Sequence, residues 1–127
     1  MKTSELTGKD LDTWVAKAQG WFIVTTPAAN GRVVKWWSNK ELNRIYRVSK
    51  YTPSTNGGQC FELLTIAHLS PSRDTWFDED TGKIVWDWWY DTEYLSPKGW
   101  REMSGPTLNI AICRAFVASV YGEEIEV

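Results

Sequence analysis

The stretch GPTLNIAICRAFVASVYG, residues 105–122, carries apolar side chains at helical spacing between two glycines. Gly105, Pro106 and Thr107 are typical of a helix start, because proline has no N–H group to leave unpaired in the first turn. Gly122 ends the segment. One face of the helix would hold Leu108, Ala111, Ile112, Ala115, Phe116, Ser119 and Val120. The sequence therefore predicts a C-terminal helix whose apolar face packs on another element.

Working outward, three further elements have clear signals. Thr7 to Asp10 has capping-box spacing, and apolar residues then recur at helical intervals up to Gly20, which predicts an N-terminal helix. Residues 21–26 and 33–37 are aromatic and β-branched around a Pro/Gly turn, which predicts a hairpin. Residues 75–78 and 83–88 flank a turn with Gly82 and predict a second hairpin.

The remaining segments are less distinct. A capping-box pattern favours a short helix from Ser38 through Ile45, although residues 45–48 fit a strand equally well. Residues 60–69 are expected to form a helix that ends before Pro71, and residues 90–101 are irregular or strand-like. The fold class we expect is α+β, a single domain over residues 1–127. An antiparallel sheet would carry the N- and C-terminal helices, and residues 123–127 would form an acidic tail.

Composition restricts the class of protein. The chain has 127 residues, enough for one core, and a net charge of −2 with a pI near 5.4, which argues against nucleic acid as a partner. Cys60 and Cys113 form no CxxC pair, and the N-terminus has no apolar signal core, so we expect free thiols in a reducing cytosol. No apolar run is long enough to cross a membrane, so we expect a soluble protein.

Nine tryptophans stand out in a chain of this length. Indole has a large apolar area and one N–H donor, so some of the rings must fill the core. Others could line a binding surface as stacking platforms or binding hot spots. The tryptophans are Trp14, Trp21, Trp36, Trp37, Trp76, Trp86, Trp88, Trp89 and Trp100.

Charge is distributed unevenly along the chain. Residues 32–50 hold six basic side chains and one acid, whereas residues 74–93 hold seven acids and one lysine. The two segments either neutralise each other or sit in solvent, or else they have functional roles. In the functional interpretation, the basic segment receives an anion, and the acidic segment excludes wrong partners or meets a basic one.

The segment YTPSTNGGQC, residues 51–60, ends in two glycines just before a predicted helix. Free N–H groups and the helix dipole at such a position are the physical basis of a phosphate or carboxylate site. Ser54, Thr55 and Asn56 could add donors. The alternative is that Thr55 or Asn56 only caps the helix, since no Walker-type lysine follows.

No catalytic or metal-binding constellation is evident. His68 is the single histidine, and neither cysteine has a neighbouring ligand. Residues 78–82 begin like a calcium loop, but the glycine comes one position early and the twelfth-position glutamate is missing, so we interpret them as a hairpin turn. We therefore expect no metal, no cofactor and no enzymatic activity, with a small hydrolase built on the carboxylates of residues 78–93 as the least favoured alternative.

Three quoted segments resemble a known family. YTPSTN with its glycines, the opening MKTSELTGKDLDTWVAKAQG and the terminal GPTLNIAICRAFVASVYGEEIEV are similar to the NinX-like family of small tailed-bacteriophage and prophage proteins, which has no settled activity. The positions that match are Tyr51, Pro53, Ser54, Thr55, Asn56, Gly57, Gly58, Gly105, Pro106, Thr107, Arg114 and Ala118. Thr52 replaces a serine, and a tryptophan-containing spacer before the glycines is missing. The resemblance implies a phage accessory protein acting in the cytoplasm of the infected bacterial host.

Together these observations predict a non-enzymatic protein that binds a small anionic or nucleotide-like molecule, used to sequester a bacterial immune signal. The predicted ligand-binding residues combine backbone donors with cationic side chains: Arg47, Lys50, Tyr51, Pro53, Ser54, Thr55, Asn56, Gly57, Gly58, Gly105, Pro106, Thr107 and Arg114. The alternative function is that of an interaction protein that inhibits a host or phage protein through the Trp-rich acidic hairpin, residues 75–90. A homodimer and a monomer both remain open.

Overall fold

The computed structural model describes residues 1–41 and 43–125, with the side chains of residues 73–78 and 83–89 outside this description. The helices are α1 (Gly8–Ala18), α2 (Gly57–Ile66) and α3 (Leu108–Tyr121). The strands are β1 (Phe22–Pro27), β2 (Val33–Ser38), β3 (Arg44–Arg47), β4 (Leu69–Asp78), β5 (Lys83–Ser96) and β6 (Gly99–Gly105). Short 3-10 turns are η1 (Thr3–Glu5), η2 (Ala29–Gly31) and η3 (Val48–Lys50).

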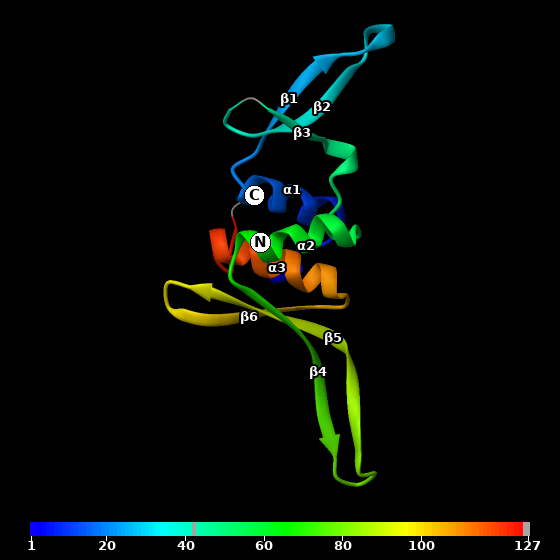
Figure 1. Cartoon of the computed structure of the whole chain (residues 1–127), viewed down its shortest axis with the longest axis vertical. Coiled ribbons are helices and arrows are strands. Elements are labelled where there is room, and N and C mark those ends of the chain that lie inside the picture. The colour runs from blue at the N-terminus through cyan, green and yellow to red at the C-terminus, as the bar shows by residue number, and fades with distance from the viewer. Residues whose placement is uncertain (42, 126–127) are drawn as a thin grey trace.

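The strands form two antiparallel sheets, β1-β2-β3 and β4-β5-β6, and the predicted α+β class is confirmed. The three helices lie between the sheets (Figure 1). The β1-β2 hairpin extends away from the helices at one end of the molecule, and the tip of the β4-β5 hairpin extends away at the opposite end (Figure 1).

Helix α3 is the centre of the molecule. It packs against β4, β5 and β6 on one side and against α1, α2 and η1 on the other. All eight residues from Ala111 to Ala118 are buried, so the helix is covered on all sides through this stretch rather than on the single face we expected. The difference arises because two layers cover α3. Ala115 and Ala118 pack with Tyr94 and Met103 of the sheet, whereas the larger side chains of α3 pack with α1 and α2.

Arg114 lies within this buried stretch. Its Nε donates to the carbonyl oxygen of Leu6 at 2.9 Å, and its Nη1 donates to that of Ser104 at 2.9 Å. Burial lowers the pKa of Arg114 from its ordinary value. The guanidinium thus connects α3 to the segment before α1 and to the end of β6, and both of its partners are main-chain carbonyls.

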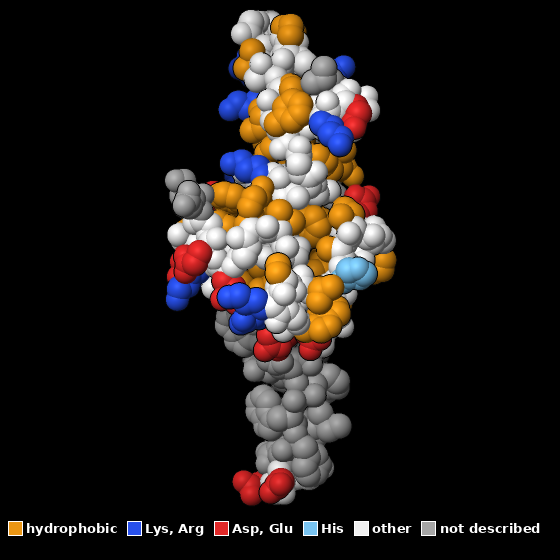
Figure 2. All heavy atoms as spheres, turned by 90° about the vertical axis from the view of Figure 1, so that its left-hand side faces the viewer, with side chains coloured by type: hydrophobic (Ala, Val, Ile, Leu, Met, Phe, Trp, Pro, Cys, Tyr) orange, Lys and Arg blue, Asp and Glu red, His pale blue; other side chains and the backbone are white. Residues whose placement is uncertain are grey.

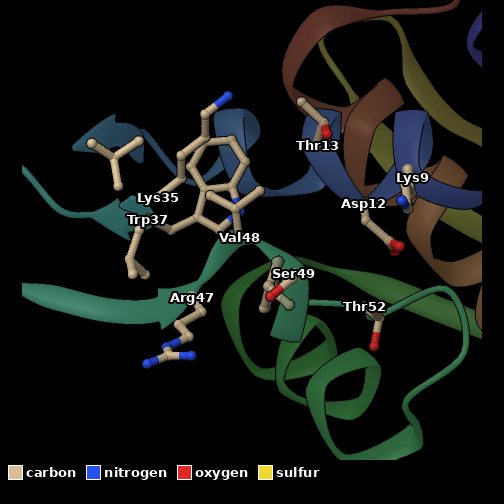
Figure 3. A pocket seen from close by; sticks show the side chains of 12 residues that line it. Lys9, Asp12, Thr13, Lys35, Trp37, Arg47, Val48, Ser49 and Thr52 are labelled. Atoms are coloured by element: carbon tan, nitrogen blue, oxygen red, sulfur yellow. The ribbon is translucent and has the colours of Figure 1, made fainter. Parts of the chain in front are cut away.

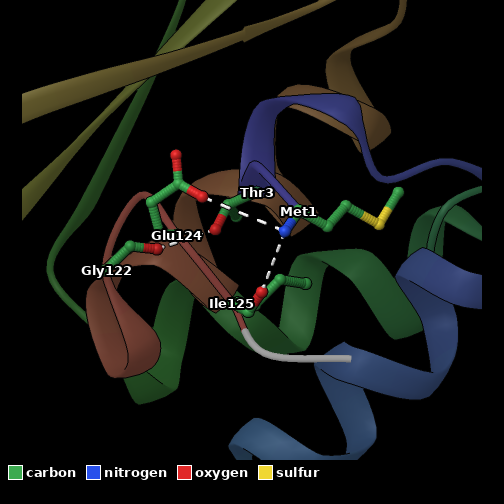
Figure 4. Close-up of polar contacts among 5 residues, drawn as sticks. All are labelled: Met1, Thr3, Gly122, Glu124 and Ile125. Carbon is green, nitrogen blue, oxygen red and sulfur yellow. Dashed lines mark hydrogen bonds and ion pairs between the residues drawn. The ribbon is translucent and has the colours of Figure 1, made fainter.

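The two ends of the chain lie side by side (Figure 4). The N-terminal ammonium donates to the carbonyl of Ile125 at 3.1 Å, and the Thr3 hydroxyl donates to that of Gly122 at 2.7 Å. Lys2 and Glu124 form an antiparallel bridge, and the Ile125 side chain is buried. The predicted acidic tail is therefore held against the N-terminus as far as Ile125.

The N-terminal helix, both hairpins and the C-terminal helix are confirmed. Between Ser38 and Ile45 the strand alternative is correct. Asn39 Oδ1 accepts from the N–H groups of Glu41 and Asn43 and forms a turn that leads into β3. A polar side chain that folds back on its own backbone favours a turn over a helix.

The predicted helix over residues 60–69 is shifted. It begins at Gly57, because Asn56 Oδ1 accepts from Gln59 N at 3.0 Å, and it ends at Ile66. Leu69 and Pro71 already belong to β4, where Pro71 pairs with Thr92. The helix thus ends before Pro71 as expected, but the strand predicted at residues 75–78 begins earlier, at Leu69; β4 is an edge strand and tolerates the proline. Residues 90–101, expected to be irregular or strand-like, belong mainly to β5 and β6.

We expect Arg114→Met to lower the free energy of unfolding by about 2–4 kcal/mol, because two charge-assisted hydrogen bonds are lost and the Leu6 carbonyl is left without its partner. Arg101→Met is the matched control. Arg101 is half-exposed and pairs with Glu123 at 3.8 Å, so its loss should cost less than about 1 kcal/mol. Urea unfolding curves measure both, and equal effects would contradict the assigned role of Arg114.

Candidate functional site

A cleft of about 490 Å³ lies between α1 and the β1-β2-β3 sheet, and we call it the α1–β2 cleft. Helix α1 contributes one wall, β2 the opposite wall, and the segment from the end of β3 to residue 52 the rest (Figure 3). Its lining residues are Lys9, Asp12, Thr13, Val33, Val34, Lys35, Trp37, Arg47, Val48, Ser49, Tyr51 and Thr52.

The two walls follow from simple periodicities. Val33, Lys35 and Trp37 alternate along β2 and therefore share one face of the strand. Lys9, Asp12 and Thr13 are spaced by three and four residues on α1 and share one face of the helix. Figure 3 shows the helix residues opposite Lys35 and Trp37, so the cleft separates a polar helix wall from a mainly apolar sheet wall that carries Lys35.

The cleft has an aromatic base. Trp37 and Tyr51 are each only 2% exposed and belong to the hydrophobic core beneath the cleft. The Tyr51 ring lies 5.0 Å from that of Trp21 and 5.1 Å from that of Tyr46, and its hydroxyl accepts from Gln19 Nε2 at 2.7 Å. Burial raises the pKa of Tyr51 well above its ordinary value, so the phenol stays neutral.

Cationic groups around the cleft outnumber acids. Lys9, Lys35 and Arg47 are exposed and come from three different elements. Asp12 is the acid among the lining residues, and it is buried with its Oδ1 accepting from the Ser54 N–H at 2.8 Å. Burial raises the pKa of Asp12, while the hydrogen bonds from Ser54 oppose that shift.

The guanidinium of Arg47 lies 5.4 Å from the centre of the Trp36 ring, and that of Arg44 lies 5.2 Å from it. The indole N–H of Trp36 donates to the Thr26 hydroxyl at 3.0 Å. Arg47 is the cross-strand partner of Trp36, so its guanidinium lies on the Trp36 face of the sheet, opposite the face of Lys35 and Trp37. The cation–π attraction there is worth about 0.5–1 kcal/mol at an exposed site. No acid takes part in these contacts.

The predicted site residues fall into two groups. Arg47 and Tyr51 line the α1–β2 cleft. Lys50 lies next to it and is exposed, with its carbonyl accepting from Gln59 Nε2 at 2.9 Å. Pro53 and Ser54 are buried behind Thr52, where the Ser54 N–H is held by Asp12.

The second group lies at two helix starts. Thr55, Asn56, Gly57 and Gly58 are exposed around the first turn of α2, where Asn56 is the cap. Gly105, Pro106 and Thr107 precede α3. The Thr107 hydroxyl accepts from Ile110 N at 3.2 Å and caps that helix.

The starts of α2 and α3 are adjacent. The Cys60 thiol of α2 lies 3.7 Å from the Asn109 carbonyl of α3. The glycines at these starts are not among the residues that line the α1–β2 cleft, however, and Arg114 is buried on main-chain partners. The structure therefore divides the predicted receptor, and only its Arg47–Tyr51 part faces the cleft.

Sequence reasoning missed the helix wall of the cleft. Lys9, Asp12 and Thr13 are three polar residues on one face of the expected N-terminal helix, but the sequence analysis assigned that face no role. Lys35 had been noted for its charge, and its alternation with Trp37 in a predicted strand placed both on one face. What the sequence could not supply was the packing that brings α1 against β2.

Among the side chains that the structure describes, no group of three or more His, Cys, Asp or Glu residues could hold a metal ion. Cys60 and Cys113 are buried free thiols. Within the same described part of the chain, none of the helices has the length and apolar character needed to cross a membrane.

These features define a small α+β protein with a cation-rich cleft between a helix and a sheet. Residues 2–120 match the family model described as Bacteriophage P22, NinX, and the chain belongs to this family. The resemblance noted in the sequence is confirmed. A search of curated proteins finds no match.

The glycines at the helix starts have different structural roles, and substitution can separate them. A Cβ at Gly105 would lie 2.8 Å from the Ala111 nitrogen, so Gly105→Ala should destabilise the protein by about 1–3 kcal/mol. A Cβ at Gly57 would meet nothing within 4 Å, so Gly57→Ala should be neutral or stabilising by up to about 1 kcal/mol. Thermal unfolding of both variants tests this, and equal stabilities would contradict the close packing of Gly105.

Asp12 predicts a specific pH dependence. Its folded-state pKa is raised above the ordinary value of 3.8, so its contribution to stability is present in full below 3.8 and is lost as the pH rises through the folded pKa. Asp12→Asn keeps an acceptor for the Ser54 N–H and does not titrate. The wild type should therefore lose stability relative to Asp12→Asn as the pH rises from about 3 towards 7. Urea unfolding across this range measures the difference, and a constant or growing advantage of the wild type would contradict the assignment.

Proposed function

We propose that this protein is a non-enzymatic phage accessory protein that binds a small anionic, nucleotide-like molecule in the α1–β2 cleft. The observation that carries the proposal is the presence of Lys9, Lys35 and Arg47, from three elements, among the lining residues of one cleft with an aromatic base. The proposed setting is the cytoplasm of the infected bacterial host, where binding would sequester a bacterial immune signal.

Size and charge support this choice of ligand. A volume of about 490 Å³ lies within the range of small-molecule sites. The three cations are exposed, so each should contribute about 1 kcal/mol to the binding of a phosphate, and less at high salt. The attraction of an anion to three such groups falls short of the binding free energy needed for a micromolar Kd, so apolar contact has to supply the rest.

The distribution of charge suggests how the ligand is oriented. Asp12 repels a phosphate, so the anionic part should lie toward Lys35 on the opposite wall. A nucleobase amino group can donate a hydrogen bond to a carboxylate, so Asp12 would favour such a group on the α1 side of the cleft. Trp37 and Tyr51 are covered by the core, so they would supply apolar contact from below rather than a free stacking face.

Sequestration requires binding without turnover. A signal molecule held in the cleft is removed from its receptor in proportion to the amount of binding protein and its affinity. Such a role needs no catalytic group, and the lining residues would only have to recognise charge and shape.

A second candidate is an interaction protein that inhibits a host or phage protein through residues 75–90. The observation that favours it is the position of the β4-β5 hairpin, which extends beyond the helices at one end of the molecule (Figure 1). A projecting hairpin can insert into a partner without disturbing the core that carries it.

The test is calorimetric and thermal-shift titration with a panel of mono-, di- and cyclic nucleotides at low salt. A bound nucleotide at one hundred times its Kd should stabilise the protein by about 2.7 kcal/mol. Lys35→Ala and Lys9→Ala should each raise the Kd about fivefold, since each removes about 1 kcal/mol of attraction. Lys98→Ala, at the exposed β5-β6 turn, is the matched control and should leave the Kd unchanged.

Each other outcome has a defined meaning. Binding that is lost in Asn56→Ala but kept in Lys35→Ala would show that the ligand binds at the start of α2, and it would overturn the proposal that the α1–β2 cleft is the binding site. No response to any nucleotide, together with a tight protein partner that requires residues 75–90, would replace the proposal with the second candidate. Consumption of the nucleotide during titration would show an enzyme.

A further inference from the structure

The two hairpin ends of the molecule carry opposite charge. We call residues 22–50, which contain β1, β2 and β3, the basic arm, and residues 74–93, which form the outer part of the β4-β5 hairpin, the acidic arm. All six basic side chains of residues 32–50 are exposed. In the acidic arm, the described side chains of Glu79, Asp80 and Glu93 are exposed. Figure 2 shows Lys and Arg on the upper arm and acidic side chains at the opposite tip.

The charges of the two arms cannot neutralise each other within one molecule. The layer of helices separates the arms, and their tips point in opposite directions (Figure 1). The two ion pairs formed among the described side chains join the N-terminus to Glu124 and Arg101 to Glu123, so neither involves the basic arm. The interpretation in which the two segments balance each other inside the fold is therefore excluded by distance.

The basic arm also exposes apolar surface. Val33 is 64% exposed, Ile23 45% and Phe22 40%, all on a sheet that lies beyond the helices. Apolar side chains beside concentrated charge are typical of a surface that another macromolecule covers. The sequence of the acidic arm is complementary in both respects, since it combines seven acids with four tryptophans.

We propose that the basic arm is covered by the acidic arm of a second copy of this chain, in an antiparallel dimer with two-fold symmetry. Each copy then supplies one basic and one acidic arm, and the same contact forms twice. A head-to-tail contact would leave an unpaired arm at each end of the assembly, whereas the antiparallel arrangement covers both arms of both copies. The net charge of −2 per chain opposes this association only weakly at physiological salt.

The proposal does not depend on the ligand of the α1–β2 cleft, because it can be tested with residues outside the cleft. Sedimentation equilibrium and light scattering of the full chain at low salt should give a mass that approaches two copies as concentration rises and then stays constant. Raising the salt should weaken the association, because exposed charges are screened beyond a Debye length of about 8–10 Å.

Charge reversal locates the contact. Arg32→Glu with Lys40→Glu in the basic arm, and separately Glu79→Lys with Glu93→Lys in the acidic arm, should each raise the dimer Kd at least about tenfold. Lys17→Glu with Lys98→Glu is the control for the first pair, because it makes the same charge change at exposed positions outside the arms and should leave the Kd within about threefold. Circular dichroism before each run checks that every variant is folded.

A mixture of the two arm variants gives a second readout. Each variant keeps one native arm, so a mixed dimer contains one native contact and should form at concentrations where either variant alone is monomeric. A wild type that stays monomeric up to about 200 µM would overturn the proposal, since a specific dimer should assemble well below that concentration. A measured mass that keeps growing with concentration would show an open chain of copies and overturn the closed dimer. A dimer Kd raised as much in the control variant as in the arm variants would show that net charge alone controls the association.

Discussion

The burial of α3 between two layers determines where α1, α2 and the β4-β5-β6 sheet lie. A helix that is covered on all sides has to satisfy whatever polar groups it carries, and the Arg114 guanidinium does so by donating to the carbonyls of Leu6 and Ser104. One side chain thus joins the start of α1 and the end of β6 to the central helix. The N-terminal and C-terminal segments, which pair with each other, close the same layer.

The candidate site depends on this arrangement indirectly, through the packing of α1 on α3. Helix α1 forms a wall of the α1–β2 cleft only because α3 supports it from behind, and Asp12 then links that wall to the loop before α2 through the Ser54 N–H. Burying a carboxylate costs desolvation free energy, which the hydrogen bond from the Ser54 N–H partly offsets for Asp12. The cleft is therefore formed by packing between elements and not by any single motif.

Local signals were sufficient for much of the fold. Capping residues and helical spacing identified α1 and α3, and β-branched runs around glycine turns identified both hairpins. Two differences have physical causes. Asn39 stabilises a turn at the position of the capping-box pattern, and β4 begins at Leu69, earlier than the predicted strand at residues 75–78, because an edge strand tolerates Pro71.

The site was less predictable than the fold, because the motif that attracted attention, residues 51–58, is divided by the structure. Its Tyr51 end faces the cleft, and its glycines start α2. The helix wall of Lys9, Asp12 and Thr13 became a site only through the approach of α1 to β2, which is a long-range packing event that no local pattern encodes. The family match identifies a phage protein, and the candidate site comes from the geometry of the cleft alone.

Pro71 has a further consequence for how this protein avoids polymerising. Both sheets end in strands that could template further strand addition, and each of two such edges carries a proline, Pro27 in β1 and Pro71 in β4. A residue without an N–H cannot donate to an incoming strand, so growth into a fibril is interrupted at these points. Two of the four edge strands, β1 and β4, are thus poor templates for an added strand.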